Sequence, residues 1–242
     1  TGAAAASTTA IQTVSSSGNS SAFLYISGGW DLSTQTQTGQ TWFRQKHTTF
    51  NNRYGYGLYM TGKSYVSLDK LNFLRYNSGI YYYSNSNNNT ITSATCNSNG
   101  SNGIYYYNTS SNNTITSATC NSNGSNGIYY SSTSNNNTIT SATCNSNGYY
   151  GIYYSGSNNN TITSATCNSN NSGIYYSGSN NNTIYALSTT GNTTAGIYAN
   201  NANNICHSAT IAESTKAAMG TTYYADTRQY INNLGGYSYV YS

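Results

Sequence analysis

Short runs of alternating apolar and polar residues recur along the middle of the chain. In Thr90–Thr92 an isoleucine separates two threonines, and Gly79–Tyr82 contains a second run of this kind. Alternation with a period of two predicts β-strands in which the isoleucines point inward and the threonines outward. A third short strand is expected at Ala94–Cys96. Clusters of Asn, Ser and Gly separate these runs, and such clusters are typical of turns.

The three runs belong to a unit that repeats along the chain, and its first clear copy reads GIYYYSNSNNNTITSATCNSNGSN. A fixed period in this range indicates a solenoid, in which each unit buries its apolar face by stacking on its neighbours. Three strands and three turns per unit predict one coil of a parallel β-helix. The glycine that opens the unit recurs at intervals of 22, 24, 24, 24, 22, 23 and 24 residues, at Gly57, Gly79, Gly103, Gly127, Gly151, Gly173, Gly196 and Gly220.

The run GIYYSGSNNNTITSATCNSNNSGIYYSGSNNNTI, from Gly151 to Ile184, closely resembles the right-handed parallel β-helix repeats of NosD-like and pectate-lyase-like surface proteins. The run GLYMTGKSYVSLDKLNF, from Gly57 to Phe73, resembles the first coils of the same group. The resemblance covers about residues 55–211. It implies an all-β, right-handed parallel β-helix with about 22–24 residues per coil and irregular caps. It implies no single function, because this fold serves lyases, hydrolases, phage tailspikes and proteins without activity.

The chain is expected to have three parts. Residues 1–50 form an N-terminal cap and assembly segment, residues 51–220 form the coils, and residues 221–242 form a C-terminal cap with one or more strands. Caps are expected because a bare last coil exposes unpaired backbone groups. Ala3–Val14 could be a capping helix or a strand over the first coil, Trp30–Phe43 alternates like a strand pair, and Tyr237–Tyr241 alternates like a final strand.

Charged residues make up 5% of the chain, against about 25% in ordinary globular proteins. The net charge of +4 comes from dispersed residues, whereas nucleic-acid binding needs several phosphate-neutralising groups on one face, so nucleic acid is not expected as a partner. No stretch approaches the ~20 apolar residues of a membrane span. The chain begins at Thr1 and is rich in Asn, Thr and Tyr. We therefore expect an exported protein at the cell surface, with its leader peptide removed.

Catalytic residues are not expected. No Asp, Glu, Lys or Arg occurs from Tyr76 to Ala212, and the acidic residues of the whole chain are Asp31, Asp69, Glu213 and Asp226. Glycoside hydrolysis needs two neighbouring carboxylates. For a lyase, the resemblance implies acidic residues that bind calcium and a basic residue that removes a proton. The two histidines, His47 and His207, lie far apart along the coils. The sequence therefore predicts no enzyme, no metal site and no cofactor.

Four cysteines occupy one position in successive coils, at Cys96, Cys120, Cys144 and Cys167. Their spacing excludes the clustered cysteine pairs of zinc sites. We expect a ladder of small buried thiols. Neighbouring coils would lie close enough for disulfides, but in-register side chains point the same way, so free thiols are favoured. Cys206 lies outside this ladder.

Tyrosines form two columns. The first is expected to point outward and contains Tyr81, Tyr105, Tyr129, Tyr153, Tyr175 and Tyr198. The second, which begins at Tyr82 and includes Tyr106, Tyr130, Tyr154 and Tyr176, is expected to point inward or to occupy a corner. Stacking between rings is a sufficient structural reason for both columns. The outward column could also bind a neighbouring subunit, which is the preferred interpretation, or a carbohydrate.

Threonines and asparagines form further columns. The paired outward threonines, Thr90/Thr92, Thr114/Thr116, Thr138/Thr140 and Thr161/Thr163, resemble the ice-binding face of antifreeze β-solenoids, although threonine is also simply favoured on exposed strands. A ladder of stacked amides is expected at the corners. Its members, Asn88, Asn112, Asn136, Asn159 and Asn181, also begin five of the eleven Asn-x-Ser/Thr sequons and are candidate glycosylation sites.

These observations favour a non-catalytic extracellular structural protein, a self-assembling subunit of a surface fibre, sheath or coat. The expected partner is the protein itself, joined head to tail into a homopolymer, because contacts of this kind do not close on themselves. The alternative is a polysaccharide-binding β-helix, such as an adhesin or spike domain. Ice binding and a polysaccharide lyase or hydrolase activity are less favoured.

Overall fold

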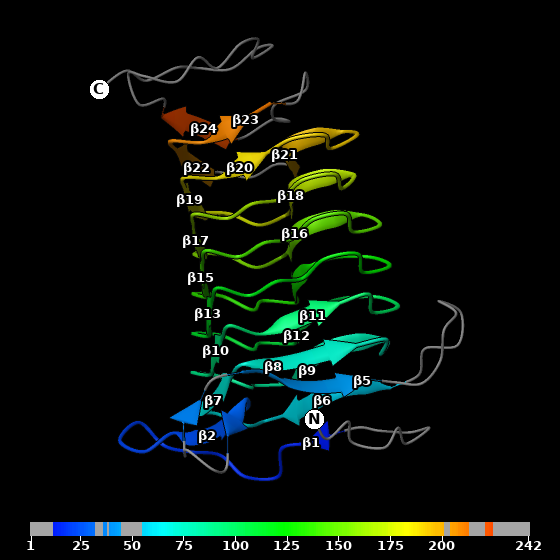
Figure 1. Ribbon diagram of the computed structural model, residues 1–242. Coiled ribbons are helices and arrows are strands. Elements are labelled where there is room, and N and C mark those ends of the chain that lie inside the picture. Colours follow the sequence, from blue (N-terminus) through cyan, green and yellow to red (C-terminus); the bar gives the residue numbers. More distant parts are fainter. Residues whose placement is uncertain are drawn as a thin grey trace.

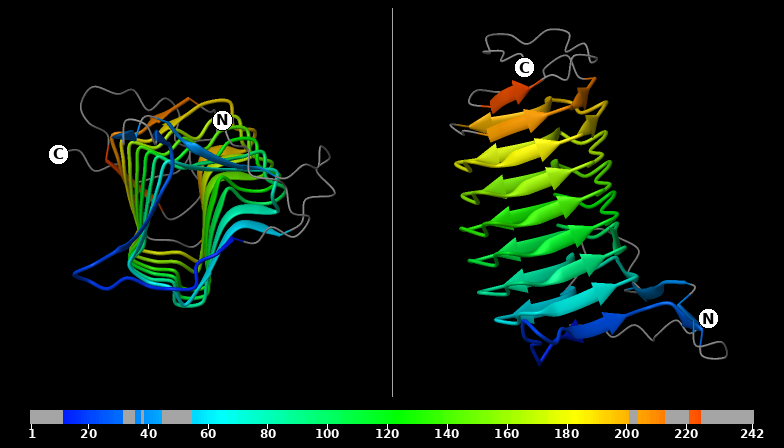
Figure 2. Two further views of the ribbon diagram at one scale, coloured as in Figure 1. Left: turned by 60° about the horizontal axis from the view of Figure 1, so that its bottom comes forward. Right: turned by 90° about the vertical axis from the view of Figure 1, so that its left-hand side faces the viewer.

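The computed structural model describes residues 12–31, 36–37, 39–44, 55–200, 204–212 and 221–224. Within these ranges the regular elements are β-strands, and Figure 1 shows them stacked in successive coils. The protein is a right-handed parallel β-helix, as the resemblance to NosD-like and pectate-lyase-like repeats implies. Seen toward one end of the stack, the coils nearly superimpose (Figure 2). The described residues contain no helix long and apolar enough to cross a membrane.

One side of the solenoid is an eight-stranded sheet, which we call the tyrosine sheet. Isoleucines of successive coils face each other in register, so that Ile104 pairs with both Ile80 and Ile128. Each of these three isoleucines is fully buried. In stacking order the strands are β1 (Gln12–Thr13), β6 (Tyr56–Thr61), β9 (Ser78–Tyr83), β12 (Ile104–Tyr107), β14 (Ile128–Ser131), β16 (Tyr150–Ser155), β18 (Ser172–Ser177) and β21 (Ala195–Asn200).

A second side is a nine-stranded sheet, the threonine sheet, whose labels rise along the left of Figure 1. Its short strands bury a central isoleucine between two half-exposed threonines, as alternation predicts. In stacking order the strands are β2 (Leu24–Ser27), β7 (Val66–Asp69), β10 (Thr90–Thr92), β13 (Thr114–Thr116), β15 (Thr138–Thr140), β17 (Thr161–Thr163), β19 (Thr183–Tyr185), β22 (Asn204–His207) and β24 (Thr221–Tyr224).

The third side has the shortest strands. β5 (Thr41–Arg44), β8 (Leu71–Leu74) and β11 (Thr95–Asn97) form one parallel sheet, and β20 (Ser188–Thr189) pairs with β23 (Thr210–Ile211). Between these two groups, single parallel bridges continue the register from Thr95 through Thr119, Thr143 and Thr166 to Ser188. This side therefore keeps the same stacking even where its segments are too short to count as strands.

Left-handed residues turn the chain at the corners. In one coil Asn88, Ser93 and Ser98 have φ between 51° and 55°, and the equivalent residues of the following coils repeat these values. Short polar side chains tolerate this conformation better than most because they bond to the nearby main chain. The Asn/Ser-rich spacers of the sequence are therefore the corners of the solenoid.

The glycine that opens each unit is required by space rather than by its backbone angle. A Cβ at Gly127 would lie 2.6 Å from the carbonyl oxygen of Gly151 and 2.9 Å from the Cβ of Cys144. Gly103 and Gly151 meet the same two kinds of neighbour. The thiol column and the glycine column are thus packed against each other, which explains why both residues recur at fixed positions.

Parallel stacking starts before residue 51, where the sequence boundary was expected. β1, β2 and β5 pair in parallel with β6, β7 and β8, so part of the expected N-terminal cap continues the coils. β3 (Trp30–Asp31) and β4 (Thr36–Gln37) form an antiparallel pair within the segment where a strand pair was expected. The expected element at Ala3–Val14 lies largely outside the described residues, and the expected strand at Tyr237–Tyr241 lies wholly outside them.

Candidate functional site

The outward tyrosines form one continuous stack along the tyrosine sheet. From Tyr81 to Tyr198, neighbouring ring centroids lie 4.5–5.2 Å apart. Between Tyr81 and Tyr175 the planes of successive rings differ by 2–20°. Each ring therefore covers the faces of its neighbours. The strip presents ring edges and hydroxyls to its surroundings from Tyr105 onward, whereas Tyr81 is buried. We call this set, Tyr81, Tyr105, Tyr129, Tyr153, Tyr175 and Tyr198, the tyrosine strip.

The tyrosine strip is poorly suited to acid–base chemistry. Burial, followed by the neighbouring Tyr105, raises the pKa of Tyr81 well above its usual value, and burial also raises that of Tyr105. The phenol groups of Tyr81 and Tyr105 therefore stay protonated at neutral pH and act as hydrogen-bond donors and acceptors. The strip can make polar and aromatic contacts, but it supplies no base.

The inward tyrosines form a second stack inside the solenoid. Tyr82, Tyr106 and Tyr130 are fully buried, and their neighbouring ring centroids lie 4.4 and 4.7 Å apart. No hydrogen bond to a described residue reaches the hydroxyls of Tyr130 and Tyr154. Their aromatic rings thus fill the core in place of aliphatic side chains, as the inward alternative predicts.

The four ladder cysteines are fully buried and carry free thiols. Burial raises the pKa of the Cys120 thiol well above its ordinary value. On the third side, the coil before Cys96 carries Phe73 at the cysteine position, and the coil after Cys167 carries the buried Thr189 there. Cys206 instead occupies the isoleucine column of the threonine sheet, opposite Ile184. Small inward side chains fit here because the glycines of the repeat approach them closely.

The expected asparagine ladder is displaced by one residue. Asn112, Asn136, Asn159 and Asn181 are exposed and left-handed, with φ of 56°, because they turn the corner. The residue after each one is buried and forms the ladder instead. The Asn113 backbone N–H, for example, donates to the side-chain oxygen of Asn137 over 2.8 Å. The buried ladder consists of Asn89, Asn113, Asn137, Asn160, Asn182 and Asn204.

Sequence reasoning missed a second buried ladder at another corner. Asn99, Asn123, Asn147, Asn170 and Asn192 are linked in the same way, with backbone N–H to side-chain oxygen distances of 2.8–3.0 Å. Four of these residues begin sequons, and their burial makes them inaccessible to a glycan in the folded protein. The exposed sequons remain accessible candidates, whereas Asn88 is half-buried.

The charged side chains that the structure describes are few and lie near the N-terminal end. Asp69 extends the outer threonine column at β7, where its carboxylate accepts a hydrogen bond from the Gln37 amide over 2.8 Å. The Lys70 ammonium donates to the Gln37 carbonyl oxygen over 3.4 Å. Asp69 is the only carboxylate among the described side chains, and Asp31, Glu213 and Asp226 have no described side chain. The described residues therefore bring together no pair of carboxylates.

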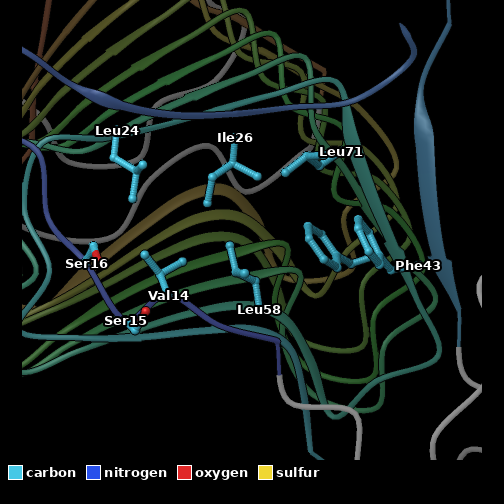
Figure 3. A pocket seen from close by; sticks show the side chains of 9 residues that line it. Val14, Ser15, Ser16, Leu24, Ile26, Phe43, Leu58 and Leu71 are labelled. Carbon is cyan, nitrogen blue, oxygen red and sulfur yellow. The ribbon is translucent and has the colours of Figure 1, made fainter. Parts of the chain in front are cut away.

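An apolar pocket of about 390 Å³ lies among the first coils, as Figure 3 shows. The side chains of β2, β5 and β8 supply Ile26, Phe43 and Leu71, and the segment after β1 supplies Val14 and Ser15. Val14, Ile26, Phe43 and Leu71 belong to the hydrophobic core at the start of the stack, whereas Ser15 is exposed. Sequence reasoning did not anticipate the pocket, because part of its wall comes from segments that precede the regular repeat.

A family model described as "Periplasmic copper-binding protein (NosD)" matches residues 34–241. Together with the fold, this match confirms the resemblance found in the repeat. No curated protein matches the chain. Within the described residues, no group of three or more His, Cys, Asp and Glu side chains could hold a metal ion. The buried thiols form a row rather than a cluster around one point, so the described residues do not fit a copper site.

Three solved structures illustrate the similarity, each at 15% sequence identity. The periplasmic alginate epimerase AlgG gives a TM-score of 0.61 and covers 83% of this chain and 57% of that chain. The pectate lyase Pel9A gives a TM-score of 0.61, and the match covers 89% of this chain and 60% of that chain. The alginate lyase from Paenibacillus sp. str. FPU-7 gives a TM-score of 0.66, and the match covers 88% of this chain and 82% of that chain. The chain therefore spans less than two thirds of the first two proteins, and these similarities show the fold alone.

Proposed function

Because the chain belongs to the NosD family and has a uniform, charge-free flank, we propose that it acts outside the cytoplasm as a non-catalytic structural protein that assembles with copies of itself into a surface fibre, sheath or coat. The observation that carries this proposal is the tyrosine strip on a flank without charged residues from Tyr76 to Ala212. Charge repulsion, which keeps many soluble proteins apart, is absent along this length.

The stacking of the strip favours protein contacts over sugar stacking. A sugar ring that packs on an aromatic side chain needs an exposed ring face, whereas the faces from Tyr81 to Tyr175 are covered by neighbouring tyrosines. Ring edges and hydroxyls suit a second protein surface, where tyrosines are enriched. The names of the similar enzymes nevertheless make polysaccharide binding the second candidate.

Assembly along the axis has support at the N-terminal end. The apolar pocket near Val14, Ile26 and Phe43 is a surface that a head-to-tail neighbour would cover. A contact between opposite ends does not close on itself and so gives a filament. Lateral contacts through the tyrosine strip would then join filaments into a sheath.

Catalysis on polysaccharides is less favoured than assembly. The lyase and epimerase names belong to proteins that share only 15% identity with this chain. The described side chains include one carboxylate, Asp69, which is bonded to Gln37. Hydrolysis by the usual two-carboxylate mechanism would need a second acid beside it.

Sedimentation across a range of concentrations, with electron microscopy of the same samples, tests the proposal. The full chain should form filaments, and Tyr129→Lys with Tyr153→Lys should remove lateral association by placing two positive charges on the strip. Thr133→Lys with Ser132→Lys, which adds the same two charges at an exposed corner, is the matched charge control. Removing residues 1–17 deletes β1 and Val14 and should shorten the filaments. A full chain that stays monomeric and binds alginate or pectate instead would replace this proposal with the carbohydrate-binding one.

A further inference from the structure

The outer face of the threonine sheet carries two straight columns of the same side chain. β10, β13, β15 and β17 contribute a threonine to each column, and parallel pairing keeps both columns in register. Thr183 of β19 extends one column to a fifth coil. Each threonine is half-exposed. We call the nine residues the threonine array: Thr90, Thr92, Thr114, Thr116, Thr138, Thr140, Thr161, Thr163 and Thr183.

The hydroxyls of the array make no hydrogen bond within the part of the chain that the structure describes. Several polar side chains elsewhere on the surface are hydrogen-bonded within the coil. On the third side, the side-chain oxygen of Asn97 accepts the backbone N–H of Asn121 over 2.7 Å. At a corner, the Thr133 hydroxyl donates to the Ser132 carbonyl oxygen over 2.6 Å. The array therefore has its donors and acceptors available to something outside the protein.

The fold does not require threonine at these positions. In the same two columns β7 carries Ser67 and Asp69, and β22 carries Ile205 and His207, without loss of register. Tyr185 continues the second column in β19. Polar, charged, aliphatic and aromatic side chains are thus all tolerated. A preference for strand formation alone does not explain why four successive coils carry threonine in both columns.

The array is a rigid two-dimensional lattice. Neighbouring coils lie about 4.8 Å apart, and alternate residues along a strand lie about 6.6 Å apart. Threonine is branched at Cβ, which restricts its rotamers. The isoleucines beneath, Ile91, Ile115, Ile139 and Ile162, are at most 1% exposed, so they fix the strands from the inside. Hydroxyl and methyl groups therefore repeat at constant positions on a surface without charges.

We propose that the threonine array binds the surface of ice. A ligand that matches a repeating lattice in two directions must itself repeat in two directions, and ice does so with hydrogen-bonding groups alone. A single polysaccharide chain repeats in one direction, so it would use one column and leave the other without a role. Charged side chains would hold their own hydration shells at such a surface, and between Asp69 and His207 the array has none. This function is separate from assembly, because it uses the threonine sheet rather than the tyrosine strip.

Thermal hysteresis and inhibition of ice recrystallisation, measured on the purified full chain, test the proposal. Thr116→Lys with Thr140→Lys interrupts one column at its centre and should abolish both activities. Thr116→Val with Thr140→Val keeps the side-chain shape while removing two hydroxyls, and it should reduce them. Thr133→Lys with Ser132→Lys adds the same two charges at an exposed corner and should leave them unchanged. Circular dichroism and the melting temperature report whether each variant is folded.

Two results would overturn the proposal. One is a folded full chain with no more thermal hysteresis than an equal concentration of a protein that does not bind ice. The other is activity that survives in the folded lysine double variant, or that is undiminished in the folded valine double variant. Binding of the full chain to insoluble cellulose or chitin without any effect on ice growth would assign the array to a crystalline polysaccharide and would also refute ice binding. Filament formation, scored separately by electron microscopy, distinguishes failure here from failure of the structural role.

Discussion

Replacing Gly127 by alanine tests whether glycine opens each coil because there is no room for a side chain. The added Cβ would lie 2.6 Å from the Gly151 carbonyl oxygen, 2.9 Å from the Cys144 Cβ and 3.0 Å from the Cys120 carbonyl oxygen. Two of these three atoms belong to the backbone of neighbouring coils. They cannot move away by a change of rotamer, so relief requires the coils to separate locally.

The expected cost is at the upper end of the range for overpacked cores, about 3 kcal/mol. Gly156→Ala is the matched control, because its Cβ would have no atom within 4 Å while its φ is +59°. An alanine in this conformation costs ~1–2 kcal/mol, partly offset because alanine restricts the unfolded chain by ~0.4–1 kcal/mol more than glycine does. The two variants therefore separate crowding from backbone conformation.

Urea unfolding followed by circular dichroism measures the difference. Gly127→Ala should lower the unfolding midpoint clearly more than Gly156→Ala. Adding Cys144→Gly to Gly127→Ala removes one of the three close neighbours and should recover only part of the loss, since both carbonyl oxygens remain. Equal midpoints for Gly127→Ala and Gly156→Ala would refute the argument from space.

Three further outcomes are expected. Asn137→Leu should destabilise the protein by about 2–4 kcal/mol in urea unfolding, because it leaves the buried Asn113 N–H without its acceptor. The variant Asn136→Ser, at the exposed neighbouring residue, should cost less than ~1 kcal/mol. Burial raises the pKa of the Tyr106, Tyr130 and Tyr154 hydroxyls above the value near 10 that they have in the unfolded chain. Their contribution to stability is therefore complete below pH 10 and falls by about 1.4 kcal/mol per group and pH unit above it. Unchanged urea midpoints from pH 9 to 11.5 would contradict this expectation. Burial raises the pKa of Cys120 and raises that of Cys206 to about 12, and the hydrogen bond with Cys120, followed by burial, raises the pKa of Cys144. Mass spectrometry should therefore find these thiols unmodified by iodoacetamide in the native protein and alkylated after denaturation, with no reductant needed.

The sequence was sufficient to predict the inward columns. Alternation around Ile91 and Ile128 fixes which residues face the core, and the constant period places equivalent residues in register. The buried Tyr130 follows from the same alternation as Ile128, two positions away. Repetition makes such predictions strong, because an error in one coil would recur in every coil and leave the core unfilled.

The asparagine ladder shows where the sequence reasoning was wrong. The runs of consecutive asparagines do not themselves say which member turns the corner and which faces inward. The alternation that places Ile139 inside also places Asn137 inside, two residues before it, and applying this rule would have identified the buried ladder. The ladder at Asn123 and Asn147 has no adjacent strand signal, so composition alone could not distinguish it from an exposed turn.

The ends of the stack were harder to predict for a different reason. The pairing of Trp42 with Asn72 and of Phe43 with Phe73 joins a segment outside the regular period to the first regular coil. No repeated spacing announces these contacts, and the apolar pocket depends on them. The charged residues Asp69 and Lys70, with their link to Gln37, also lie in this less regular part.

In a chain of this kind, repetition by itself is weak evidence of function, because the fold requires the repeated residues to stack. Gly127, Ile128 and Asn137 recur for reasons of space, burial and hydrogen bonding, and each is explained by contacts inside the solenoid. A repeated residue suggests a function only where the fold would accept other residues. The outer columns of the threonine sheet meet this condition, since Asp69 and His207 occupy the same column as Thr116 with unchanged pairing. The function of the flank is therefore best sought among its outward threonines and tyrosines rather than in the ladders that hold the coils together.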